Sequence, residues 1–301
     1  MGIYNLSYII CTKNRLPFLQ ILFERFVSRC EPDEEIIAID GNSTDGSKEF
    51  LQELYKQGKI HQFVSEPDKS QAHGWNKGLL LANGSLIKKL IDDDVHSLSA
   101  IRQCKNFMLN NPDIDICISN CLVTDLATYK DIHAASRYRY YEAWKNGITT
   151  CFSFSDVYML IRKSSLSFLG LFDTQFRMMD WEYALRCSFL RANIAYYTGH
   201  NALTVGTPGN ITSTIPAQIL KKEGEIGKLK YGYKGDRSDI SLLSEVKIAI
   251  GKAIRYKSSK NPDNYADGDN SNLTDLDDIY SYLYKYLEDQ NAVGNFEFTG
   301  K

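Results

Sequence analysis

Three consecutive aspartates, Asp92, Asp93 and Asp94, are the residues with the clearest capacity for chemistry. They follow SLIKKLI, residues 85–91, an apolar run typical of an interior strand. Clustered carboxylates repel one another unless a cation neutralises them, and Mg²⁺ or Mn²⁺ is commonly held by one or two carboxylates plus substrate phosphates. In an extended backbone Asp92 and Asp94 project to one face and Asp93 to the other. We therefore predict a divalent metal at Asp92 and Asp94 and a phosphorylated ligand; the alternative is a solvated, helix-capping turn.

The elements before this triplet alternate between strand and helix patterns. Strands are predicted at 6–12, 35–40, 59–66 and 85–91, with helical spacing of apolar residues after each of the first three. Such β-α repeats form a parallel sheet flanked by helices, and ligands bind beyond the carboxyl ends of its strands. The four strand ends carry TKNR, DGNSTDG, EPDKSQ and DDD. Four polar ends in register predict one shared site. Because the chain has neither a GxGxxG nor a GxxxxGK[ST] motif, phosphate binding must rest on the metal.

Composition bounds the class of protein. The chain has 301 residues, is 43% hydrophobic and has a net charge of −2, so it shows no excess of positive charge that would favour nucleic acid. We expect no signal peptide and no membrane span, and therefore a cytoplasmic protein. The seven cysteines form no CxxC pair and are expected to be free thiols, mostly buried.

Four segments, in this order, resemble the successive motifs of family 2 glycosyltransferases with the GT-A fold: YIICTKNR, IAIDGNSTDGS, EPDKSQAHGWNKGLLLANGSLIKKLIDDD and FDTQFRMMDWEYALR. The resemblance covers roughly residues 6–205 and is greatest to bacterial enzymes of capsule, exopolysaccharide and lipopolysaccharide synthesis. It implies a Rossmann-like, mostly parallel α/β sheet in a catalytic domain at 1–205, with a nucleotide-sugar half at about 1–97 and an acceptor half at about 98–205. A turn-rich stretch near 206 then leads to a mainly helical extension at 206–301.

The resemblance also implies an activity and its residues. The implied activity is transfer of a sugar from a nucleotide-diphospho donor, with a UDP-sugar as the expected donor, to a hydroxyl of a glycan or lipid-linked acceptor. The transfer is expected to depend on a metal and to invert the anomeric centre. The metal ligands correspond to Asp92 and Asp94, and the catalytic base to Asp180. The residues matched to motif positions near the donor nucleotide and sugar are Thr12, Asn14, Asp40, Asp68, Lys77 and Asp93.

Three positions depart from the family pattern. Gly41 stands where a second acidic residue is usual, and Met179 stands where Glu usually precedes the base. Many relatives carry Tyr-Asp before the NKG element, whereas here His73 and Gly74 stand nearby. A carboxylate that removes the acceptor proton typically contributes about 10²- to 10⁴-fold in rate. Glu182 is about 200° further round a helix than Asp180, so only one of them can face the cleft, and we favour Asp180. The alternative role for Asp180 is to stabilise a helix N-terminus.

Several alternatives stay open at this point. A nucleotidyltransferase would share the metal and carboxylates, although CTKNRLP lacks the expected glycine; an inactive carbohydrate- or nucleotide-binding module would be consistent with Met179. One of Lys88 and Lys89 could balance the aspartates. The segment SRYRYYEAWKNG, 136–147, could form an acceptor-side lid or a packed excursion. A basic amphipathic helix near 246–257 could dock on an anionic membrane or on the catalytic domain.

Overall fold

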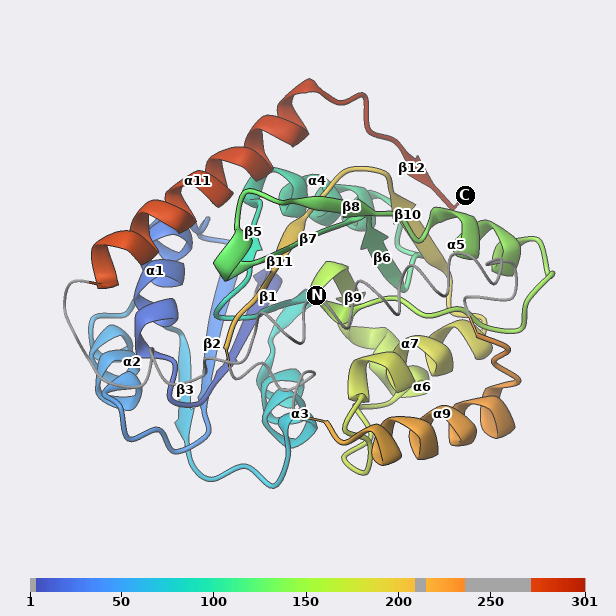
Figure 1. Cartoon of the computed structure of the whole chain (residues 1–301), viewed down its shortest axis with the longest axis horizontal. Coiled ribbons are helices and arrows are strands. Elements are labelled where there is room, and N and C mark those ends of the chain that lie inside the picture. The colour runs from blue at the N-terminus through green and yellow to red at the C-terminus, as the bar shows by residue number, and fades with distance from the viewer. Residues whose placement is uncertain (1–3, 209–214, 236–271, 301) are drawn as a thin grey trace.

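An eight-stranded sheet forms the centre of the computed structural model, which describes residues 4–208, 215–235 and 272–300 (Figure 1). Its strand order is β12-β10-β6-β9-β4-β1-β2-β3. The strands are β1 (Tyr4–Thr12), β2 (Glu34–Asp40), β3 (Gln62–Ser65), β4 (Gly84–Leu90), β6 (Ile116–Ser119), β9 (Met159–Arg162), β10 (Ile194–Tyr197) and β12 (Phe298–Thr299). β1 to β4 pair in parallel, as do β6 and β10, whereas β9 and β12 run antiparallel to their neighbours. The expected mostly parallel α/β sheet is confirmed.

The strand that leads to the aspartates is interior, as predicted. β4 lies between β9 and β1, and its side chains alternate between the two hydrophobic cores that cover the faces of the sheet. Leu86 and Leu90 belong to one core and Ile87 to the other, so residues 86–90 are withdrawn from water. Because β1 to β4 pair in parallel, their carboxyl ends lie at the same edge of the sheet.

Helices follow the strands in the predicted repeats. The helices of the first half are α1 (Leu16–Phe26), α2 (Ser47–Lys56), α3 (Gln71–Leu81) and α4 (Leu98–Asn110). Those that follow are α5 (Tyr138–Lys145), α6 (Leu166–Leu169), α7 (Met179–Phe189), α9 (Ala217–Tyr231) and α11 (Asn272–Val293). Ser70 and Ser97 cap α3 and α4 by accepting from the N–H groups of His73 and Ala100, which fixes where these helices begin. In α5, Tyr141 and Trp144 are buried in the core, so the packed reading of 136–147 holds for these two residues.

A second, four-stranded sheet was not predicted. It has the order β5-β11-β7-β8, with β5 (Val95–His96), β11 (Ala202–Gly206), β7 (Cys121–Asp125) and β8 (His133–Ala135). β5 begins directly after Asp94 and pairs antiparallel with β11. The turn that carries the aspartates is therefore fixed at both ends, by β4 in the large sheet and by β5 in the small one.

The described parts of 206–301 lie against the α/β core. Figure 1 shows α9 alongside α7, and α11 running past α1 before the chain returns to place β12 beside β10. Leu283 and Leu287 of α11 are buried in a cluster with Val95 and Leu203 of the small sheet. The domain boundary near 205 stays a prediction, and the basic helix near 246–257 lies outside the described residues.

Disulfides and membrane-spanning helices are both missing from the part of the chain described. All seven cysteines are free and most are buried, as expected. No helix among residues 4–208, 215–235 and 272–300 is long and apolar enough to cross a membrane.

Candidate active site

The aspartate triplet forms a buried turn and not an extended segment. The N–H of Asp94 donates to the carbonyl of Ile91 at 3.2 Å, and this bends the chain as it leaves β4. Thr12 at the end of β1 donates its hydroxyl to Asp92 Oδ2 at 2.7 Å, whereas Asp94 Oδ1 accepts from the N–H of Val205 on β11 at 2.9 Å. The expected alternation of side chains in an extended backbone is therefore wrong here, because the turn directs Asp92 and Asp94 to different strands.

Arg15 supplies the positive charge that contacts the triplet. Its Nε lies 3.4 Å from Asp92 Oδ1, and its Nη2 pairs closely with Asp93 and donates to Thr207 Oγ1 at 3.0 Å. Burial raises the pKa of Asp92 to about 6, the positive charge of Arg15 opposes the rise, and the negative charge of Asp93 adds to it. The loop after β1 thus neutralises part of the charge at the end of β4.

The two lysines of β4 contact other groups. Lys88 is fully buried and its ammonium contacts the carbonyl of Val157; burial lowers its pKa to about 7. Lys89 forms a buried ion pair with Asp156 and lies over the rings of Trp75 and Phe172, 4.0 and 4.7 Å from their centroids. Arg15, and neither lysine, makes the ion pairs with Asp92 and Asp93.

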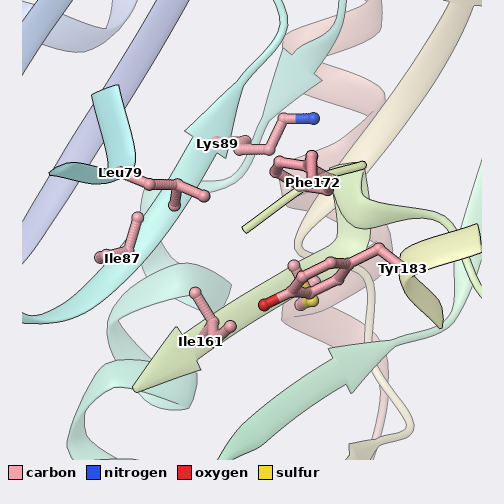
Figure 2. A pocket seen from close by; sticks show the side chains of 7 residues that line it. Leu79, Ile87, Lys89, Ile161, Phe172 and Tyr183 are labelled. Atoms are coloured by element: carbon pink, nitrogen blue, oxygen red, sulfur yellow. The ribbon is translucent and has the colours of Figure 1, made fainter. Parts of the chain in front are cut away.

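Lys89 also lines a small apolar cavity below the site, shown in Figure 2. The other lining residues are Leu79, Ile87, Met159, Ile161, Phe172 and Tyr183. Its volume of about 10 Å³ has room for roughly one water molecule, so it cannot hold a sugar. In Figure 2 the ammonium of Lys89 extends across Phe172. The cavity belongs to the packing behind the site and not to a ligand pocket.

The loops after β1 and β2 are locked together. Asn14 has a left-handed backbone (φ 54°), its N–H donates to Ser43 Oγ at 2.8 Å, and its Oδ1 accepts from the N–H of Thr44 at 2.8 Å. Asp40, at the end of β2 and fully buried, accepts from the N–H of Ser43 and from Ser65 Oγ at 2.6 Å. A left-handed non-glycine residue is a strained feature that tends to occur at functional loops. The sequence-predicted residues Asn14 and Asp40 therefore share one loop network, which also orders the end of β3.

A second group of predicted residues gathers after β3. Lys77 of α3 lies 2.8 Å from Asp68 Oδ1 and 3.0 Å from Glu66, and His73 Nδ1 is 3.2 Å from Asp68 Oδ1. A Cβ on Gly74 would lie 2.9 Å from Asp68 Oδ2, closer than such contacts occur. Gly74 therefore leaves room for the Asp68 carboxylate.

Asp180 occupies the first turn of α7 and is partly exposed. Burial raises its pKa to about 6; the negative charge of Asp156 adds to the rise and the positive charge of Lys89 opposes it. Glu182, the competing carboxylate, is fully buried and pairs with Arg186 at 2.8 Å. Of the two, Asp180 is the carboxylate still available to a ligand, and a raised pKa suits a proton acceptor.

The residues around the triplet fit a divalent cation. Arg15 pairs with Asp92 and Asp93, whereas Asp94 accepts from the N–H of Val205, so three buried carboxylates share a single guanidinium. Burial, followed by the charges of Asp93 and Asp92, raises the pKa of Asp94 well above its ordinary value. A cation would relieve that repulsion, and Mg²⁺ or Mn²⁺ needs only one or two protein carboxylates when a substrate supplies phosphate oxygens.

A different acidic group has three oxygens close together. Among the residues described, Glu31, Asp33 and Glu34 are the set whose ligand atoms lie within 4.8 Å of one another. Lys105 lies 3.0 Å from Glu31, 3.3 Å from Asp33 and 2.9 Å from Glu34, so a lysine already occupies the centre of this group. This acidic group lies at the amino end of β2, away from the strand ends that carry the candidate site. We interpret it as a structural ion-pair cluster.

Three contributors to the site were missed by sequence reasoning. Arg15 is part of the TKNR strand end, and its charge next to an acidic cluster was the signal that could have found it. Thr207 pairs closely with Asp93, and the hydroxyl of Tyr280 on α11 donates to the carbonyl of Asp93 at 2.5 Å. Thr207 and Tyr280 lie more than 100 residues from the aspartates, and no local pattern marks them.

Comparison with known proteins decides the family. The family model described as "Glycosyl transferase family 2" matches residues 7–170, slightly more than half of the chain. The chain belongs to glycosyl transferase family 2. This family membership is as expected, and the matched segment includes β1 to β4 and the aspartate triplet.

Individual relatives of this family member are distant. Over 148 residues it is 27% identical to TuaG of Bacillus subtilis (strain 168), named as a teichuronic acid biosynthesis glycosyltransferase; the match covers 48% of this chain and 59% of TuaG. Its fold is similar to that of S. aureus TarS 1–349 in complex with UDP-GlcNAc, with a TM-score of 0.58, 14% identity, and coverage of 76% of this chain and 68% of TarS. It is also similar to the mannosyltransferase PcManGT from Pyrobaculum calidifontis in complex with GDP-Man and Mn²⁺ (TM-score 0.53, 14% identity, 94% and 87% covered). These similarities confirm the GT-A fold.

Proposed function

We propose that this glycosyltransferase moves a sugar from a nucleotide-diphospho donor to a hydroxyl of a glycan or lipid-linked acceptor, with a divalent metal and with inversion at the anomeric carbon. The observation that carries the proposal is the buried turn of Asp92, Asp93 and Asp94, tied to the end of β1 by Thr12 and Arg15. A carboxylate cluster at a strand end with residual negative charge suits a cation that grips a diphosphate.

The surrounding loops support the donor side of the proposal. At or just beyond the carboxyl ends of β1 to β4 lie Thr12, Asn14, Asp40, Asp68 and Asp93, and Lys77 of α3 pairs with Asp68. This is the edge where open α/β sheets bind nucleotides. A UDP-sugar is the first donor to test because TarS, a structural neighbour, forms a complex with UDP-GlcNAc; GDP-Man is the second, because PcManGT forms a complex with it.

The proposed reaction assigns the acceptor proton to Asp180. The Asp180 carboxylate accepts the proton of the acceptor hydroxyl while that oxygen forms a bond to the anomeric carbon. The bond between the anomeric carbon and the diphosphate breaks, and its electron pair leaves with the nucleoside diphosphate. A divalent cation bound at Asp92 and Asp94 would supply charge neutralisation for this leaving group. Attack opposite to the leaving group inverts the anomeric centre.

The experiment pairs binding with turnover. Thermal unfolding of the purified protein is followed with UDP-sugars and GDP-sugars, with and without Mn²⁺, because a ligand of the native state raises the midpoint by mass action. We expect a rise for one nucleotide class that depends on Mn²⁺ and is lost in Asp94→Asn. Donor hydrolysis is measured in the same samples. No rise across the panel would contradict the proposed donor class.

The same assay separates an enzyme from a binding module. If Asp180→Asn abolishes donor turnover but leaves the nucleotide-dependent rise in midpoint intact, the protein is a transferase with its base at this position. Binding with no turnover by the unmodified protein, under any donor and acceptor tested, would favour the inactive module. Membrane docking through the predicted basic helix near 246–257 stays a prediction, tested by sedimentation of a 240–257 deletion with anionic vesicles.

A further inference from the structure

The chain just before Asp180 is held by a carboxylate from α9, a helix outside the matched family segment 7–170. The Glu223 side chain accepts from the backbone N–H of Arg177 at 2.8 Å and from that of Met178 at 2.9 Å. Met178 is the N-cap residue of α7, and its thioether is only a weak acceptor. Glu223 therefore caps α7 from another helix, where a carboxylate also meets the favourable end of the helix dipole.

The chain just after Asp180 is held by α9 as well. A Cβ on Gly227 would lie 2.3 Å from Cη2 of Trp181, so the two helices approach closely only because α9 has no side chain there. The hydroxyl of Tyr231 donates to the carboxylate of Glu182 in a close contact. Figure 1 shows α9 running beside α7 along this stretch. Contacts from α9 thus flank Asp180 on both sides.

The burial of Glu223 indicates that its hydrogen bonds matter. Glu223 is 5% exposed, whereas Glu225, two residues further along the same helix, is exposed. A buried carboxylate costs several kcal/mol unless it is hydrogen-bonded, and two backbone N–H groups meet that requirement. Those N–H groups belong to the residues that lead into Asp180, so the placement of Glu223 determines where the first turn of α7 starts.

We propose that Glu223 is a positioning residue for sugar transfer, which holds the N-terminus of α7 so that the Asp180 carboxylate reaches the acceptor hydroxyl. The inference rests on the proposed function of Asp180. A displacement of about 1 Å in a reacting group can cost about 10²-fold in rate. The segment 217–231 would then complete the catalytic site from outside the part of the chain that the family match covers.

The first test compares Glu223→Gln with Glu225→Gln, which removes the same charge from an exposed position on the same helix. Gln keeps one acceptor oxygen but points an NH₂ group at the second backbone N–H. We expect kcat to fall roughly 10- to 100-fold in Glu223→Gln, while donor KM and nucleotide affinity change less than about twofold. Hydrogen exchange at the amides of residues 177 and 178 should become faster. Glu225→Gln should match the unmodified protein in each measurement.

The second test asks whether Glu223 acts through Asp180. Residues that act as a unit give non-additive losses. In single-turnover assays, Glu223→Gln combined with Asp180→Asn should be no slower than Asp180→Asn alone, and a multiplicative loss would overturn the inference. If Glu223→Gln does not fold, Gly227→Ala replaces it, because the added Cβ would displace Trp181. This variant should likewise lower kcat while donor KM changes little.

The outcomes separate this inference from the proposed function. Full activity in Asp180→Asn would reject both the base and the positioning role. A slow Asp180→Asn variant beside a Glu223→Gln variant as fast as Glu225→Gln would reject the positioning role alone.

Discussion

Replacing Asp180 by asparagine should make the protein slower and more stable at the same time. Burial raises the Asp180 pKa from its ordinary 3.8 to about 6, so the folded protein holds this group in its charged form at a cost. Two pKa units correspond to about 3 kcal/mol at 1.36 kcal/mol per unit. Because the side chain is partly exposed, solvent screening reduces this to about 1–2 kcal/mol. Asparagine is nearly isosteric and removes the charge.

The sign of the effect follows from proton linkage. Well below pH 4, Asp180 is protonated in the folded and the unfolded chain and costs nothing. Between about pH 4 and pH 6 the unfolded chain loses this proton while the folded chain keeps it, so stability falls as pH rises. Above about pH 6 the full cost is present. The Asp180→Asn variant should therefore exceed the unmodified protein by about 1–2 kcal/mol at pH 7.5 and by much less at pH 4.5.

Urea unfolding at the two pH values measures this difference by linear extrapolation. Asp278→Asn, at an exposed position on α11, is the matched control and should show no such pH-dependent gain. In parallel, Asp180→Asn should transfer sugar about 10²- to 10⁴-fold more slowly. A stability difference that is the same at both pH values, or a variant less stable at pH 7.5, would refute the electrostatic reasoning even if activity is lost.

Three further changes probe the donor side. Gly74→Ala adds a Cβ that would lie 2.9 Å from Asp68 Oδ2; it should displace that carboxylate and weaken nucleotide binding several-fold by calorimetry, with little change in melting temperature because alanine favours a helix. Arg15→Ala leaves Asp92 and Asp93 without their cationic partner and should lower the free energy of unfolding, measured in urea, by roughly 3 kcal/mol. The loss should be smaller with Mn²⁺ present, and an equal loss with and without Mn²⁺ would argue against a metal at the triplet. Tyr280→Phe removes the hydrogen bond to the Asp93 carbonyl and should cost about 1 kcal/mol of stability; an unchanged unfolding midpoint would show that α11 does not support the turn.

The strands and the ends that carry polar residues could be predicted because their signals are local. β4 spans Gly84–Leu90 against a predicted 85–91, since an apolar run buried on both faces identifies an interior strand directly. β3 is shorter than predicted, Gln62–Ser65 against 59–66, because Lys59 and Ile60 form the turn after α2. α11 lies in the predicted helical extension, but the contribution of its buried Tyr280 was missed.

The sequence by itself determined the α/β class and the order of the first four strands along the chain, through its hydrophobic periodicity. The polar residues at the strand ends also identified the acidic triplet as the candidate site. Only the tertiary structure decided what those groups touch. Three contacts depend on how segments far apart in the sequence pack together. They are the pairing of Arg15 with Asp92 and Asp93, the capping of α7 by Glu223, and the hydrogen bond between Tyr280 and Asp93, which spans 187 residues. The physical reason is that a helix or strand is encoded by neighbours a few residues apart, whereas a contact between remote segments is set by the packing of both cores and leaves no periodic trace in either segment.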